Sequence, residues 1–152
     1  MARRKKTKKD GCPKRVGERS ELHVMAKLMG NGMPILIPFG DSERYDFVVD
    51  EGGDFVRVQC KTGRVERSGT VVVFETCSTN WYSGGKKNYI GQADVFAVFV
   101  PELDEVYLFD VSGCPKTEAT ARLTETANKQ KKGIRMAQDH LFVAGKSLRS
   151  YP

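Results

Sequence analysis

The chain has 152 residues, of which 39% are hydrophobic and 29% are charged, a balance typical of one globular domain. No apolar run approaches the roughly 18 residues that a membrane span needs, and none follows the basic N-terminus as a signal peptide would require. We therefore expect one soluble intracellular domain, in the cytoplasm or nucleoid, with no membrane partner.

The net charge of +6 comes from the N-terminus, because residues 1–15 hold eight Lys or Arg and one Asp (+7), and the other 17 basic and 18 acidic residues give −1. We expect residues 1–15 to form a basic arm, residues 16–145 the folded domain and residues 146–152 a tail. The side chains of the arm suited to nonspecific phosphate contact are Arg3, Arg4, Lys5, Lys6, Lys8 and Lys9. A solubilising leader or a nuclear localisation signal would have the same composition.

Cysteine and histidine are sparse and scattered. The cysteines are Cys12, Cys60, Cys77 and Cys114, and they form no C-x-x-C pair. A zinc site needs closely spaced ligands, so this pattern favours reduced, structural thiols, with Cys60 and Cys77 as small apolar strand residues.

Apolar residues recur at helical spacing between residues 17 and 29, and Gly30-Asn31-Gly32 ends the pattern. The apolar residues of this expected helix are Leu22, Met25, Ala26, Leu28 and Met29. Glu21 lies beside them, where an acid near a helix start would also suit the macrodipole. Glu18 lies in the first turn and is a candidate cap.

Residues 34–38 are a short apolar segment with two prolines, which indicates an edge strand. The turn at residues 40–43 follows. It is expected to present Ser42 and Arg44 beside Asp46 for DNA binding, although a plain polar turn would look the same.

Residues 44–62 predict a β-hairpin. An aromatic and β-branched run at 45–49 and an alternating run at 55–61 flank a turn with two glycines. Paired residues of a hairpin lie about 5 Å apart, so Asp46 is expected within reach of Gln59 and Lys61. Side chains alternate along a strand, so Gln59 and Lys61 share one face and Cys60 points to the other.

The β-branched residues 70–76 predict a third strand, and residues 95–100 and 105–111 a hairpin at the far side of the sheet. Residues 117–123 fit a strand or a short helix. Between these elements, residues 78–89 interleave aromatic residues and lysines with turn formers. Such side chains contact phosphates and stack on bases. The predicted DNA contacts are Trp81, Lys86, Lys87 and Tyr89, unless the aromatic rings fold back on the core.

Together these segments resemble the PD-(D/E)XK nuclease superfamily. Asp46 followed by Gln59-Cys60-Lys61 is similar to its signature, with Gln where the second acid usually stands. The helix around Glu21 is similar to the first helix of archaeal Holliday junction resolvases and of group I intron homing endonucleases. Residues 37–46, 93–99 and 133–135 resemble the intron branch more closely. The resemblance implies an α/β, restriction-endonuclease-like fold, with the N-terminal helix packed on a mixed central sheet.

The resemblance also implies a divalent-metal-dependent DNA endonuclease like the homing endonucleases. Its catalytic residues would be Glu21, Asp46, Gln59 and Lys61, and Mg²⁺ (or Mn²⁺) would be held by Asp46, Gln59, the Cys60 backbone carbonyl and Glu21. Lys61 would orient or deprotonate the attacking water, or neutralise the phosphate. Cutting two strands requires two active sites, so we expect a homo-oligomer, a dimer or tetramer, on double-stranded or branched DNA.

Other interpretations stay open. A structure-selective nuclease similar to Holliday junction resolvases would read branched shape instead of sequence. An inactive nucleic-acid-binding module of the same fold is the second alternative, because Gln59 removes one negative charge from the site. A basic ribosomal or chromatin protein would account for the arm but not for Asp46, Gln59 and Lys61.

Overall fold

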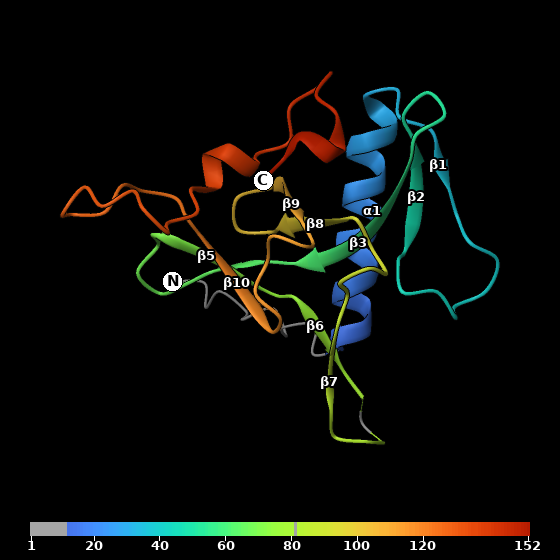
Figure 1. Cartoon of the computed structure of the whole chain (residues 1–152), viewed down its shortest axis with the longest axis horizontal. Coiled ribbons are helices and arrows are strands. Elements are labelled where there is room, and N and C mark those ends of the chain that lie inside the picture. Colours follow the sequence, from blue (N-terminus) through green and yellow to red (C-terminus); the bar gives the residue numbers. More distant parts are fainter. Residues whose placement is uncertain (1–11, 81) are drawn as a thin grey trace, which may run out of the picture.

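The structure is a computed structural model that describes residues 12–80 and 82–152. One helix, α1 (Pro13–Gly30), lies against a five-stranded sheet of order β1-β2-β3-β8-β9 (Figure 1). The strands are β1 (Ile35–Leu36), β2 (Phe47–Asp50), β3 (Phe55–Thr62), β8 (Val95–Val100) and β9 (Glu105–Asp110). β3 and β8 are parallel and the other neighbours are antiparallel, so the sheet is mixed. The expected fold class is confirmed.

A second sheet of order β10-β5-β4 contains β4 (Arg64–Val65), β5 (Val71–Glu75) and β10 (Glu118–Arg122). The strand expected at residues 70–76 therefore exists but does not join the central sheet. Residues 117–123, for which a strand or a short helix was expected, contain the strand β10. A separate ribbon pairs β6 (Cys77–Thr79) with β7 (Lys86–Asn88), and two short 3-10 helices, η1 (Ala137–His140) and η2 (Leu148–Ser150), follow.

The alternation of β3 divides the core into two clusters. Val56, Val58 and Cys60 are buried with Val24 and Leu28 of α1 on one face. On the opposite face of the central sheet, residues of β8 and β9 form a second cluster with residues of the second sheet. Gln59 and Lys61 alternate with the buried positions, so they share the face of β3 opposite to Cys60, as the hairpin pattern predicts.

The buried face of α1 does not coincide with the apolar series of the sequence. It consists of Ser20, Val24 and Leu28, which are spaced four apart, whereas Leu22 and Met29 are each 62% exposed. Four-residue spacing keeps side chains on one stripe, and at 100° per residue Leu22 lies on the other side of the helix. Of the apolar residues named for this helix, Leu28 is buried, whereas Leu22 and Met29 are not. Among the described residues, no helix is both long and apolar enough to cross a membrane.

The C-terminal residues pack with the domain. Leu148 and Tyr151 are buried in the helix-side cluster, and the Glu51 carboxylate accepts from the Leu148 backbone N–H at 2.7 Å. The Asp110 N–H donates to the Pro152 carbonyl at 3.1 Å, which adds the chain end to β9. Residues 146–152, expected as a tail, thus help close the edge of the sheet.

Candidate active site

The predicted catalytic side chains meet where β2 and β3 separate. The β2–β3 ladder reaches the Phe47–Val58 pair, and the Asp46 N–H adds one bond to the Val58 carbonyl at 2.9 Å. Beyond it, the Asp46 side chain takes the place of a strand partner: its Oδ2 accepts from the Cys60 N–H at 2.7 Å and from Gln59 Nε2 at 2.9 Å. The hydrogen bonds at this end of the hairpin thus hold the Asp46 carboxylate in a fixed position.

Burial raises the pKa of Asp46, and the bonds from Cys60 and Gln59 and the charge of Lys61 only partly oppose this. Both hydrogen bonds end on Oδ2, so Oδ1 has no partner among the described residues. Among these residues no fully buried side-chain oxygen or nitrogen lacks a partner, which leaves Oδ1 open to solvent. Asp46 therefore has one oxygen fixed by the fold and one available to a ligand.

Glu21 approaches the same point from α1. Its pKa is raised by burial and then by the negative charges of Asp46 and Glu18. Burial raises the pKa of the Cys60 thiol well above its usual range, with further contributions from the charges of Asp46 and Glu21. The charge of Asp46 thus raises the pKa of Glu21, and the charges of both carboxylates raise the pKa of the Cys60 thiol. Glu21 is the helix acid whose charge acts on the Cys60 thiol.

A hydrogen bond that was not predicted from the sequence joins α1 to β3 at this position. Ser20 Oγ and Thr62 Oγ1 are 2.6 Å apart, and Ser20 is buried. Each of these residues is the immediate neighbour of a predicted catalytic residue, Glu21 or Lys61. The Ser20–Thr62 bond therefore sets the height of the helix acid along β3.

Lys61 contacts the start and the end of the β6–β7 ribbon. Its Nζ donates to the Cys77 carbonyl at 3.2 Å and to the Tyr89 hydroxyl at 3.3 Å, and lies 4.5 Å from the centre of the Tyr89 ring. Within the part of the chain that the structure describes, no ion pair joins Lys61 to a carboxylate. An ammonium has three donors, so one N–H of Lys61 remains for a phosphate or a water.

The oxygen donors suit a hard divalent cation. Asp46 Oδ1 and the Glu21 carboxylate supply negative charge, and Gln59 uses its amide nitrogen toward Asp46, which leaves its carbonyl oxygen. The Cys60 N–H points at Asp46, and its carbonyl lies on the same edge of β3 because the two groups of one strand residue share a side. No set of three or more His, Cys, Asp or Glu side chains within the described ranges could hold a metal. Two carboxylates with neutral oxygens and water match Mg²⁺, which keeps several waters.

The predicted DNA contacts lie in different environments. Ser42, Lys86 and Lys87 are exposed. Trp81 and the arm residues, Arg3, Arg4, Lys5, Lys6, Lys8 and Lys9, are outside the described residues. Tyr89 is only 6% exposed, so the alternative that this ring folds back on the core is the observed one.

Arg44 binds within the protein. Its guanidinium donates to Gln92 Oε1, Ser78 Oγ and the carbonyls of Lys87 and Asn88, at 3.0, 2.7, 3.1 and 2.9 Å, and lies 4.1 Å from the Tyr89 ring centre. Four of the five guanidinium N–H groups are thus used. Arg44 links the segment that leads into Asp46 to the ribbon, a role for which the sequence gives no signal.

Comparison with known proteins agrees with this geometry. Residues 12–143 match the PD-(D/E)XK endonuclease family, and the chain belongs to that family. The chain is similar to the structure of a bacterial homing endonuclease, I-Ssp6803I, with 25% sequence identity and a TM-score of 0.66 over 86% of this chain and 89% of that one. A search of curated proteins found no match. The fold and the family together define the chain as a nuclease.

Proposed function

We propose that the protein is a divalent-metal-dependent endodeoxyribonuclease, similar to homing endonucleases, that uses Mg²⁺ or Mn²⁺. The observation that carries the proposal is the convergence of Glu21, Asp46, Gln59 and Lys61 at the point where β2 and β3 separate. Three separate segments, α1, the segment before β2, and β3, supply these groups. Their contacts leave oxygen donors and one ammonium N–H available on the same site.

Hydrolysis of a phosphodiester needs an activated water, stabilisation of charge on the phosphoryl oxygens and help for the leaving alkoxide. A bound divalent cation supplies the Lewis acid and lowers the pKa of water. Asp46 would be its principal ligand, with Glu21, the Gln59 amide oxygen and the Cys60 carbonyl completing the protein side. Lys61 would direct its remaining N–H at a phosphate oxygen, because its other bonds end on uncharged oxygens.

A groove of about 420 Å³ beside Lys61 supports DNA as the substrate. It is lined by the first turns of α1, by Thr62 and by the side chains of Arg64 and Glu75. The Arg64 guanidinium at this groove is exposed and pairs with Glu118 at 3.4 Å, and it would exchange this exposed ion pair for a phosphate next to the cut. Cutting both strands of a duplex would require two copies of the site, so a dimer or tetramer is part of the proposal.

Plasmid nicking tests the proposal directly. Purified full-length protein should nick supercoiled plasmid with Mg²⁺ and not with EDTA, and Lys61→Ala should lower the rate at least 100-fold, in the range of losing one charged transition-state contact. Lys116→Ala, at an exposed lysine, is the matched control and should cut like the parent. DNA binding without cleavage in either metal would identify an inactive module instead.

A second experiment separates the two nuclease alternatives. A four-way junction and a library of linear duplexes, offered together, compete for the same enzyme. Preferred cutting of particular linear sequences supports the homing-endonuclease-like function. Preferred cutting of the junction, whatever its sequence, supports a resolvase-like function.

A further inference from the structure

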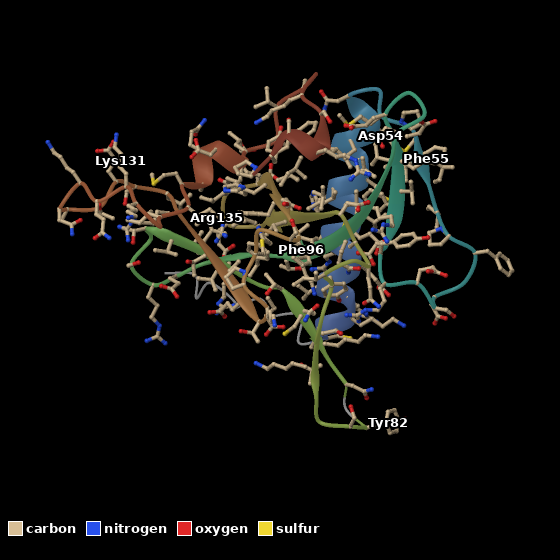
Figure 2. The ribbon with its side chains drawn as sticks, viewed as in Figure 1. Asp54, Phe55, Tyr82, Phe96, Lys131 and Arg135 are labelled. Carbon is tan, nitrogen blue, oxygen red and sulfur yellow. The ribbon has the colours of Figure 1, made fainter. Side chains whose placement is uncertain are left out.

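The β6–β7 ribbon extends away from both sheets (Figure 1). Its two strands pair only with each other, in the register Cys77–Asn88, Ser78–Lys87 and Thr79–Lys86. Tyr82 lies at the far end of the ribbon with its side chain fully exposed (Figure 2). A two-stranded ribbon is barely stable by itself in water, so its root must hold it in place.

The root is held by the active site itself. Lys61 donates to the carbonyl of Cys77, the first residue of β6. Arg44, two residues before Asp46, donates to Ser78 and to the carbonyls of Lys87 and Asn88. Both strands of the ribbon are therefore bonded to side chains from the segments that carry Asp46 and Lys61, and the ribbon starts at a fixed position relative to the proposed site of hydrolysis.

The composition of the ribbon suits nucleic acid. Residues 77–90 contain two lysines and no Asp or Glu, in a chain with 19 acidic residues. Lys86 and Lys87 are exposed. Two hydrogen bonds join described residues near the tip: Asn80 Oδ1 accepts from the Tyr82 N–H at 2.9 Å, and the Asn80 carbonyl accepts from the Gly84 N–H at 2.8 Å.

We propose that the β6–β7 ribbon enters the major groove of duplex DNA and selects the base pairs beside the cut, with Arg44 as the positioning residue that joins the ribbon to the active site. The inference rests on the proposed nuclease function. From Cys77 to Asn80, where the turn begins, the chain spans about 10 Å if extended. That length exceeds the groove depth of about 8.5 Å, and a two-stranded ribbon fits its width of about 12 Å. At about 3.4 Å per base pair, the bases read would lie within about five pairs of the scissile bond.

A selection from random DNA tests this without requiring cleavage. Full-length parent, a ribbon variant (Tyr82→Ala with Lys86→Ala and Lys87→Ala) and a control (Lys27→Ala with Lys116→Ala) are each incubated with a random linear duplex library in EDTA. Bound duplexes are sequenced. Arg44→Lys is measured in parallel, because an ammonium cannot reproduce four guanidinium bonds.

The parent and the control should enrich the same short sequence, and the ribbon variant should lose at least tenfold of that enrichment, as expected for one lost base contact. In Mg²⁺, any cleavage should fall within about five base pairs of the enriched sequence. In Arg44→Lys, the distances between the enriched sequence and the cleavage position should vary more widely than in the parent. Loss of enrichment in the ribbon variant, with no cleavage by the parent, would refute the nuclease proposal and support base selection by the ribbon alone. The inference is overturned if the parent enriches no sequence, or if the ribbon variant binds more weakly with the parental preference unchanged.

Discussion

Replacing Gln59 by Glu adds a negative charge to the site next to Asp46. Gln59 Nε2 lies 2.9 Å from Asp46 Oδ2, so Gln59→Glu would bring two carboxylates into direct contact. Carboxylates this close share a proton. Keeping a proton on a carboxyl of ordinary pKa, about 4.3, costs about 3.7 kcal/mol at pH 7. Repulsion between two unit charges 4 Å apart at an effective dielectric constant of 20 gives about 4 kcal/mol. The cost of the proton and the charge repulsion therefore give the same upper limit for the loss of folding stability.

The loss should depend on pH in a defined direction. The folded variant binds a proton that the unfolded chain releases above about pH 4.3, so folding stability falls as the pH rises through and beyond that value. At pH 5 the same proton costs only about 1 kcal/mol. For a chain of this size about 2–4 °C of Tm corresponds to 1 kcal/mol, so the Tm of the variant should lie up to about 8–16 °C below the parent at pH 7.

Thermal unfolding of parent, Gln59→Glu and Gln59→Ala at pH 5 and pH 7 measures this, first in EDTA and then in excess Mg²⁺. Gln59→Ala is the control, because it loses the hydrogen bond, worth about 1–2 kcal/mol, without adding a charge. A cation held at the site should neutralise the pair, so Mg²⁺ should raise the Tm of Gln59→Glu more than that of the parent. An equal deficit at both pH values, or one that Mg²⁺ leaves unchanged, would refute the reasoning.

Three further predictions concern other parts of the chain. Removing residues 1–11 should weaken DNA binding and reduce its salt dependence by about 0.9 in log–log slope per lost phosphate contact, and an unchanged slope in binding titrations would exclude the arm. Asp46→Asn should abolish plasmid nicking but retain gel-shift binding, whereas nicking at the parental rate would move the active site elsewhere. Gly63→Ala should lower stability by about 1–3 kcal/mol, because its Cβ would lie 2.8 and 2.9 Å from methyl groups of Val98 and Val100; a Tm equal to the parent's would contradict this.

The hairpin shows how much local pattern can predict. Period-two alternation in β3 and the glycine turn before it were enough to place Gln59 and Lys61 on one face, Cys60 on the other and Asp46 beside them, because paired strands and alternating side chains follow from backbone geometry. The helix was predicted less well. Its apolar residues cover more than one face, and only packing against β3 and β8 decides that Val24 and Leu28, but not Leu22 or Met29, are buried.

The sequence by itself determined the hairpin, the two strands after residue 94 and the groups that the hairpin brings together. Tertiary structure alone decided that β8 lies parallel to β3, that β5 leaves the central sheet and that the Ser20–Thr62 bond fixes Glu21 beside Asp46. It also decided that Arg44 and Lys61 hold the ribbon. These contacts join residues 16 to 44 positions apart, and local propensity carries no information about partners so distant, since their pairing depends on how the whole core packs.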